Sequence, residues 1–151
     1  MYGLTFEPFR PAYQGAARQL IESNLAQRWG TLDPALNPDL LDIVAHYRPG
    51  WFLLAFHAQT LVGTGALLES EYGVQVVRMH TLRDSQGQGV GSAMLVELEQ
   101  LAVREGVVEL VLETTKTWHD AIAFYTKRGY EKTHATDDDA WFHKRLMPPV
   151  R

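Results

Sequence analysis

The chain has 151 residues, of which 46% are hydrophobic and 21% are charged, and this balance predicts one globular domain over residues 1–151 with a single core. It contains no cysteine, which excludes disulfides, thiolate metal sites and a cysteine nucleophile. The formal net charge is -4, and the 14 lysines and arginines are scattered along the chain, so we expect no nucleic-acid partner.

The N-terminus and the hydropathy of the chain favour a cytoplasmic protein. Residues 1–5 show neither the basic segment nor the apolar segment that begin a secretion signal. No apolar run approaches the roughly 20 residues that a membrane-spanning helix needs. We therefore expect no membrane partner.

The N-terminal third predicts one strand and two helices. Residues 4–9 favour a short strand, and residues 12–28 place apolar side chains on one face of a helix. Asn37 and Pro38 then provide an N-cap followed by proline at the first helical position. Apolar residues continue from there at helical spacing, so we expect a second helix from Asn37 to about Tyr47.

Three consecutive antiparallel strands and a third helix are predicted next. Residues 51–56 and 61–68 are apolar runs on either side of a short polar link, and residues 74–82 form the next strand after a turn. Apolar side chains from Val90 to Ala102 then recur at helical spacing and form one face of the third helix.

The C-terminal third adds a central strand, a helix and two further strands. Residues 107–112 are nearly all apolar, which predicts a strand covered on both faces at the centre of the sheet. A fourth helix follows over about residues 118–127, and residues 130–135 and 140–146 favour strands. The predicted fold class is mixed α/β (α+β), with a central, mostly antiparallel sheet flanked by about four helices.

A glycine-rich loop joins the third of these strands to the third helix. The run Gln86-Gly87-Gln88-Gly89-Val90-Gly91 lacks the side chains that would keep a ligand away from the backbone. The helix begins there with unpaired N–H groups and the positive end of its dipole, so a diphosphate would fit. Ser92 stands where a dinucleotide-binding fingerprint needs its third glycine, and the chain has no G-K-[ST] run, so two common phosphate loops are excluded.

Two sequence motifs stand out in the second half of the chain. The first is Q/R-x-x-G-x-G/A, which Gln86 to Gly91 match and which Arg78-Met79 precede on the strand. The second is A-I-x-x-Y-x-x-x-G-F, which residues 121–130 resemble, with Tyr125 at the central tyrosine. Both motifs resemble the signatures of the GCN5-related N-acetyltransferases, the GNAT superfamily. The two lie in register, and the resemblance covers about residues 74–130. It implies the GNAT-like acyl-CoA N-acyltransferase fold.

The resemblance also implies acetyl-CoA as co-substrate. In the family, a distorted strand before the glycine loop lets its backbone bind the pantetheine arm and face the thioester oxygen, which places this role on His80 to Leu82. An ordinary sheet ladder is the alternative. The expected CoA-binding residues are Met79, His80, Thr81, Leu82, Gln86, Gly87, Gln88, Gly89, Val90, Gly91, Ser92, Trp118 and Tyr125. The histidines show no metal-ligand spacing, so we expect no metal.

The implied chemistry is direct attack of a neutral amine on a bound thioester. Such an enzyme positions both reactants, stabilises the oxyanion and protonates the leaving thiolate, and it needs no covalent enzyme intermediate. Tyr125 is the candidate acid, because a phenol with an ordinary pKa of about 10 is protonated at neutral pH. Its place in the family signature, beside the CoA sulfur, supports this role, and packing of the helix on the sheet is the alternative.

Three alternatives stay open for the general base. Many GNAT relatives carry a carboxylate on the strand before the glycine loop, and this chain has no acid there. His80 is the first candidate, because its ordinary pKa of about 6.5 suits proton abstraction near neutrality. Glu113 is the second, and a water relay to a more distant acid is the third. In structural terms, His80 is alternatively a packing residue, and Glu113 a cap or a partner of Lys116.

Trp118 marks a departure from the family. Many members have an asparagine at the start of the fourth helix that contacts the CoA arm, and this chain has Trp118 there. In one interpretation Thr114, Thr115 or Thr117 provides a substitute hydroxyl, and in another the indole packs against the arm. Its size favours the wall of the acceptor site or the core.

The acceptor is the least defined part of the prediction. The resemblance implies that the first two helices and their link, about residues 24–47, form one wall of the acceptor cleft. Carboxylates and aromatic rings there suit a cationic amine, although charged helix faces are usually only solvated. The residues concerned are Glu22, Asp33, Asp39, Asp42, Trp29 and Tyr47.

The predicted function is acetyl-CoA-dependent N-acetylation of a small-molecule or protein amine through a ternary complex. Two alternatives stay open. One is an acyltransferase with another acyl donor or an oxygen acceptor, and the other is a non-catalytic acyl-CoA-binding or regulatory module, which the missing strand carboxylate favours. A homodimer is one option for the assembly.

Overall fold

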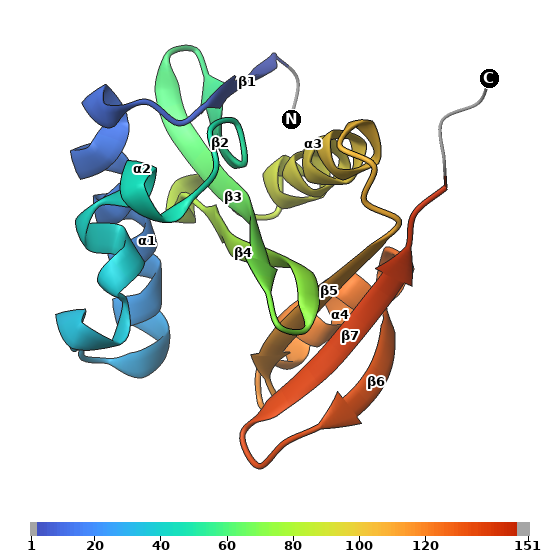
Figure 1. The fold of residues 1–151 in the computed structure, drawn as a ribbon. Coiled ribbons are helices and arrows are strands. Elements are labelled where there is room, and N and C mark those ends of the chain that lie inside the picture. Colours follow the sequence, from blue (N-terminus) through green and yellow to red (C-terminus); the bar gives the residue numbers. More distant parts are fainter. Residues whose placement is uncertain (1–2, 148–151) are drawn as a thin grey trace. The chain divides into compact units, whose positions relative to one another are not determined.

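The computed structural model describes residues 3–147, which form two compact units (Figure 1). The first unit runs to Leu68 and also contains Val77–Leu98. The second contains Glu69–Val76 and the described residues from Glu99 on. A single domain over residues 1–151 stays a prediction.

The first unit is built on strands that are neighbours in the order β1-β2-β3-β4. Their bounds are β1 Leu4–Pro8, β2 Phe52–His57, β3 Thr60–Ser70 and β4 Gly73–Thr81, and the last two also contribute residues to the second unit. β1 pairs with β2, and β2 with β3, in antiparallel registers. The predicted strands are thus confirmed to within one or two residues at each end.

One face of these strands is covered by the N-terminal helix. α1 (Gln14–Trp29) follows a short 3₁₀ turn, η1 (Pro11–Tyr13), and lies beside these strands (Figure 1). It buries Ala17, Leu20 and Ile21. These side chains recur at the three- and four-residue spacing that the sequence predicted for this helix. The core on this face also contains Leu40, Ile43, Tyr47, Phe52, Leu54, Phe56 and Ala66.

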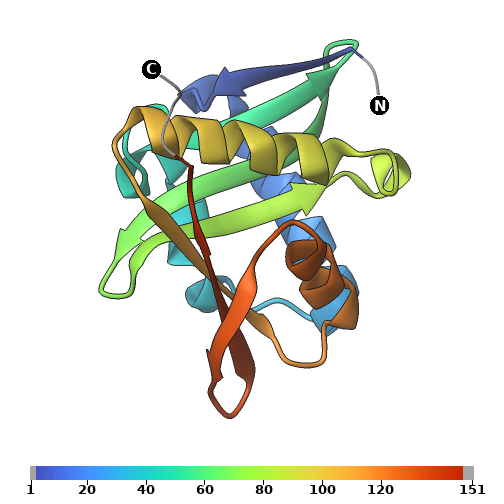
Figure 2. The same cartoon turned by 90° about the vertical axis from the view of Figure 1, so that its right-hand side faces the viewer.

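The first half of α3 (Val90–Arg104) covers the opposite face of the same strands (Figure 2). Gly65 in β3 permits this approach, because a Cβ at that position would lie only 2.6 Å from Cγ of Met94. Val90, Met94 and Leu98 are each at most 1% exposed. This close packing fixes the start of α3 directly after the glycine loop.

The predicted continuous helix from Asn37 to Tyr47 is wrong. The structure has three short elements between α1 and β2: η2 (Pro34–Leu36), η3 (Pro38–Leu41) and α2 (Ile43–His46). The break lies at Asp42, whose φ of -153° and ψ of 87° are not helical. Asn37 precedes Pro38 as predicted, but its side chain makes no cap hydrogen bond.

Gln14 of α1 bridges the break in this link. Its Nε2 donates to the Leu40 carbonyl at 2.7 Å, and its Oε1 accepts from the Ile43 N–H at 3.1 Å. One side-chain amide therefore satisfies both backbone groups that an uninterrupted helix would have paired internally. The apolar residues do recur at helical spacing, but the backbone breaks at Asp42, and Gln14 of another element pairs the groups on either side.

The second unit contains α4 and the remaining strands. Its elements are β5 (Glu109–Thr115), α4 (His119–Lys127), β6 (Glu131–Ala135) and β7 (Asp139–Arg145), in the strand order β4-β5-β7-β6. β5 pairs with β7, and β6 with β7, in antiparallel registers, whereas β5 pairs with β4 in parallel. Over residues 3–147, a seven-stranded sheet with four α-helices confirms the predicted mixed α/β class.

The prediction that β5 is covered on both faces is wrong. Burial alternates along the strand: Leu110, Leu112 and Thr114 are buried, whereas Glu113 is exposed. Val108, just before the strand, is 63% exposed. The apolar run in the sequence therefore corresponds to one buried face.

A network of hydrogen bonds links Tyr130, Glu99, Lys144 and Arg128 in the second unit. The hydroxyl of Tyr130, a residue that is 1% exposed, donates to Glu99 Oε2 at 2.8 Å. Lys144 Nζ donates to both oxygens of Glu99, at 3.2 and 3.1 Å, and to the Arg128 carbonyl at 3.0 Å. Burial raises the pKa of Tyr130, so the hydroxyl keeps the proton that this network uses.

Candidate functional site

The glycine-rich loop lies at the N-terminus of α3 in the first unit. After β4, a short turn, η4 (Arg83–Ser85), leads to Gly87 and Gly89, whose φ angles are 79° and 89°. Side-chain-bearing residues rarely adopt this left-handed conformation. A Cβ on Gly87 would meet no atom within 4 Å, so the space over the loop is open. The Ala93 N–H donates to the Gly89 carbonyl at 3.0 Å, which places the amino end of α3 at the loop.

The two glutamines of the loop hold it against the chain just before it. Gln86 Nε2 donates to the Thr81 carbonyl at 3.3 Å, and Gln88 Nε2 donates to the Asp84 carbonyl at 3.4 Å. These contacts define the path of the loop through side chains, because its glycines provide none.

Strand β4 carries the distortion that the resemblance leads us to expect. Arg78 has a φ of 55°, in the left-handed region, which costs a residue with a side chain about 1–2 kcal/mol. Thr64 Oγ1 of β3 donates to the Arg78 carbonyl at 2.7 Å. The neighbouring strand therefore holds the distorted peptide in place through a side chain.

The backbone of His80 to Leu82 is only partly available for a ligand. The Leu82 N–H donates to the Val62 carbonyl of β3 at 2.7 Å, so it is not free to face a thioester oxygen. The Thr81 carbonyl accepts from Asn24 Nδ2 at 2.9 Å as well as from Gln86. Successive backbone groups point to opposite edges of a strand, so the Thr81 N–H points away from β3. Among these predicted donors, Thr81 fits the role better than Leu82.

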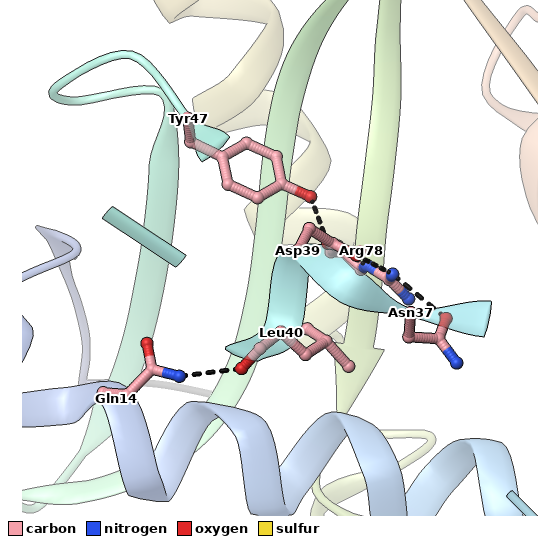
Figure 3. A network of polar contacts seen from close by, with 6 residues as sticks. All are labelled: Gln14, Asn37, Asp39, Leu40, Tyr47 and Arg78. Carbon is pink, nitrogen blue, oxygen red and sulfur yellow. Dashed lines mark hydrogen bonds and ion pairs between the residues drawn. The ribbon is translucent and has the colours of Figure 1, made fainter. Parts of the chain in front are cut away.

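The side chain of Arg78 is tied to the link between α1 and β2 (Figure 3). Its Nε donates to Asp39 Oδ2 at 2.9 Å, and its Nη2 donates to Asp39 Oδ1 at 2.6 Å. Nη2 also donates to Asn37 Oδ1 at 3.1 Å, and the Tyr47 hydroxyl donates to Asp39 Oδ2 at 2.7 Å. Burial raises the pKa of Tyr47, so its hydroxyl stays protonated and donates. Sequence reasoning missed this network, although a lone arginine in an apolar strand is a signal that a carboxylate partner exists.

His80 lies in the same unit and is a weaker base than the sequence suggested. Burial, followed by the charges of Arg78 and Arg28, lowers its pKa from 6.5 to about 4. The imidazole is therefore neutral at physiological pH. A neutral ring accepts a proton, but its low pKa limits the driving force for taking one from an ammonium group.

Two of the carboxylates that suggested a cationic acceptor form ion pairs within the protein. Asp39 binds Arg78, and Glu22 Oε1 lies 3.1 Å from Nε of Arg18. Although burial alone would raise it, hydrogen bonds from Arg78 and Tyr47 hold the pKa of Asp39 below its usual value. Asp39 is thus charged, but its charge is balanced within the protein.

Tyr125 belongs to the second unit, on α4. Its ring packs edge-on against Phe124 and Tyr130, with centroids 5.1 and 5.7 Å away. Burial raises its pKa, so the phenol is protonated at every physiological pH. Its ionisation state therefore suits an acid, and its ring contacts also give it a packing role.

Trp118 and Glu113 also belong to the second unit. Trp118 occupies the N-cap position of α4, where its N–H donates to the Thr115 carbonyl at 3.0 Å and its carbonyl accepts from the Ile122 N–H at 3.1 Å. Its backbone thus supplies a helix start. Glu113 is exposed on β5, and desolvation together with the nearby charge of Asp139 raises its pKa.

The predicted site residues thus divide between the two units. The glycine loop, Met79, His80, Thr81 and Leu82 lie in the first unit, and Glu113, Trp118 and Tyr125 lie in the second. Within the described residues, no group of three or more histidines, aspartates or glutamates is arranged to hold a metal ion. None of the helices in that part of the chain is long and apolar enough to cross a membrane.

The second unit also contains a cavity of about 690 Å³ between α4 and strands β6 and β7. Ile122 and Thr126 from the helix and Lys132 and Phe142 from the strands contribute to its lining. The predicted site residues are not part of this lining.

Known proteins share both the sequence pattern and the fold. The chain is 36% identical over 121 residues to an "IAA acetyltransferase" of Azospirillum brasilense, with 78% of each chain covered. It is 29% identical over 119 residues to "N-acetyltransferase 8B" of Homo sapiens, covering 73% of this chain and 52% of that protein.

Solved structures show the same fold at low sequence identity. A GNAT-family acetyltransferase of Staphylococcus aureus superposes with a TM-score of 0.84 at 18% identity, covering 96% of this chain and 100% of that one. The PaiA N-acetyltransferase of Thermoplasma acidophilum, solved in complex with coenzyme A, superposes with a TM-score of 0.78 at 15% identity, covering 95% and 99%. The sequence model of the Acetyltransferase (GNAT) family matches residues 11–130. With its glycine loop, distorted strand and mixed sheet, the chain belongs to the GNAT acetyltransferase family.

Proposed function

We propose that this protein is an acetyl-CoA-dependent N-acetyltransferase that moves the acetyl group directly to an amine in a ternary complex. The observation that carries the proposal is the loop at the amino end of α3, with Gly87 and Gly89 in left-handed conformations and open space over Gly87. Such a loop fits a diphosphate, since a ligand there meets backbone rather than side chains. A cytoplasmic location and a small-molecule or protein amine as acceptor belong to the same proposal.

The residues of the loop would hold the diphosphate of CoA. Backbone groups of Gly87, Gly89 and Gly91 approach the anion, and the amino end of α3 provides a favourable dipole. The Thr81 N–H, which points away from β3, is our candidate donor to the pantetheine arm or to the thioester oxygen. Bound acetyl-CoA supplies an activated acetyl group as a thioester.

Tyr125 would protonate the leaving thiolate. Because burial raises its pKa, the phenol carries its proton throughout the physiological range and has no competing role as a base. His80 remains our first choice for the base, with Glu113 and a water relay as the alternatives. A histidine with a pKa of about 4 suits an amine that is already neutral better than it suits an ammonium group.

One observation favours a second function, that of a non-catalytic acyl-CoA-binding module. Strand β4 has no carboxylate, and Asp39, which Arg78 of this strand contacts, is held by two hydrogen bonds from that arginine. A protein that binds acyl-CoA without a base would bind it and not turn it over.

The test is a screen of amine acceptors with acetyl-CoA, in which release of free CoA is measured. Release that depends on an acceptor supports the transferase. Binding of CoA without release on any amine supports the non-catalytic module. Absence of CoA binding at millimolar concentration contradicts both.

A further inference from the structure

We propose that Arg78 is a specificity-determining residue, which binds a carboxylate of the acceptor through Nη1, so that the preferred acceptors are amines that also carry a carboxylate. This inference rests on the proposed transferase function. It replaces the cationic-amine site that the carboxylates of the link suggested.

The guanidinium of Arg78 is held rigidly by its partners. Asp39 binds the edge formed by Nε and Nη2, at 2.9 and 2.6 Å, and Asn37 takes a further hydrogen bond from Nη2 at 3.1 Å (Figure 3). Tyr47 in turn orients the Asp39 carboxylate. A planar guanidinium fixed along one edge presents its remaining nitrogen in a defined direction, which lowers the entropy lost on binding.

That remaining nitrogen, Nη1, is available to a ligand. Within residues 3–147 it has no hydrogen-bond partner, and no side-chain nitrogen or oxygen there is both buried and unpaired. Nη1 therefore reaches solvent, although the Arg78 side chain is only 16% exposed. It offers two N–H donors to solvent at the end of a side chain that is otherwise enclosed.

The local charge balance favours an anion over a cation. Asp39 neutralises Arg78 in part. Burial, and after it the charges of Arg78 and Arg28, lowers the pKa of His80, so these two arginines make a positive contribution to the potential at the ring. A positive potential repels an ammonium group and attracts a carboxylate. The same field suits an acceptor whose amine is neutral.

The backbone of Arg78 supports a functional role for the side chain. Its left-handed conformation is unfavourable for arginine, and the surrounding hydrogen bonds from Thr64 and to Asp39 are needed to maintain it. The distortion directs the side chain from β4 to the link. On the proposed function, this link forms one wall of the acceptor cleft.

The experiment compares matched acceptors that differ only in the carboxylate. 4-Aminobenzoate and 4-aminobenzamide form one pair whose amines are both neutral at pH 7, and an ω-amino acid with its amide forms a second. We expect kcat/KM in the wild type to be at least about tenfold higher for the carboxylates. Arg78→Gln should lower kcat/KM for the carboxylates about 10- to 100-fold more than for the amides, which is the usual effect of losing a hydrogen bond to a charged group.

Two further variants separate recognition from folding. Arg78→Lys keeps the charge but lacks the planar set of N–H donors of the guanidinium. It should also lower kcat/KM for the carboxylates more than for the amides, but by a smaller factor than Arg78→Gln. Arg48→Gln is the matched control. It removes an arginine that stacks on Trp51, 4.2 Å from the ring centroid, and should leave kcat/KM unchanged for both members of each pair. The thermal shift with CoA reports folding and cofactor binding for every variant.

Each outcome decides a different point. Equal kcat/KM for both members of each pair in the wild type overturns the role of Arg78 and leaves the transferase standing. An equal loss on both members in Arg78→Gln and Arg78→Lys makes the side chain structural and also overturns it. No release of CoA with any acceptor contradicts the proposed function itself.

Discussion

Arg78 and Asp39 stand 39 positions apart in the sequence, yet Nη2 of the arginine lies 2.6 Å from Oδ1 of the aspartate. The two side chains are only 16% and 18% exposed. An ion pair at this depth contributes little net stability, but removal of one partner leaves an uncompensated charge in a poorly solvated place. The pair therefore makes residues 37–47 depend on β4 for their position.

Asp39→Asn should destabilise the protein by about 1–3 kcal/mol at pH 7, because it leaves Arg78 without its counter-charge. Asp39 has a lowered pKa, so its contribution is present above the ordinary carboxyl pKa and is lost as the pH falls through the lower value in the folded state. Urea unfolding at pH 7 and pH 3 measures this difference. Asp42→Asn, at an exposed position of the same link, is the control and should unfold like the wild type. A similar loss in both variants would contradict a specific role for the ion pair.

CoA or acetyl-CoA should raise the melting temperature in a concentration-dependent manner, because a ligand that binds only the folded protein stabilises it. Gly89→Val should abolish the shift, since Gly89 has a φ of 89° and valine at this angle is strained and fills the ligand space. Gly15→Ala is the matched glycine control and should keep the shift. Gly15 lies in helix α1, and a Cβ at this position would meet no atom within 4 Å. A wild-type protein that shows no shift at millimolar CoA would rule out the cofactor.

Tyr125→Phe should lower turnover by roughly ten- to a thousandfold while CoA affinity is kept, because only the proton donor is removed. The ring contacts with Phe124 and Tyr130 stay in place. Steady-state kinetics together with CoA titration separate the two effects. Unchanged turnover in the phenylalanine variant would leave Tyr125 with a packing role only.

His80 should affect both catalysis and stability at acid pH. If it is the base, the rate should rise with pH through an apparent pKa of about 4, and His80→Gln should remove this limb while Glu113→Gln retains it. An acceptor whose ammonium group titrates well away from pH 4, such as hydrazine or an aryl amine with a strongly electron-withdrawing substituent, keeps the titration of the substrate apart from that of the enzyme. The reverse result would transfer the role to Glu113, and identical profiles in both variants would favour a water relay.

The stability effect of His80 has a defined sign. Between pH 6.5 and about 4 the unfolded chain binds a proton at His80 that the folded chain does not, so stability falls as the pH decreases through this window. His80→Gln should flatten that slope. Chemical unfolding at several pH values from 7 to 4 tests this, and an unchanged slope would contradict the lowered pKa.

The sequence predicted those parts of the fold that depend on local pattern. β2, β3 and β4 and the first half of α3 follow directly from apolar runs and helical spacing, because the pattern of their own apolar residues marks the faces that become buried. The link after α1 could not be predicted in this way. Its start at Pro38 was correct, but the break at Asp42 depends on Gln14, which is distant in the sequence.

The candidate site was predictable in its chemistry but not in its electrostatics. The glycines of the loop and Tyr125 could be placed by motif. The left-handed backbone of Arg78 could not, because arginine disfavours this conformation, and only contacts with Thr64 and Asp39 maintain it. Likewise the pKa of His80 depends on burial and on two arginines, and no spacing rule contains that information.

Residues 37–47 form two short helical elements, η3 and α2, separated by a break at Asp42. Two side chains from outside, Gln14 and Arg78, hold the link, while Leu41 and Val44 within it are 56% and 51% exposed. A segment anchored at a few points tolerates replacement of the residues between its anchors. The exposed positions of the link can therefore be varied while its anchors are kept. Libraries of variants at these positions offer a route to new acceptors that does not disturb the sheet or the glycine loop.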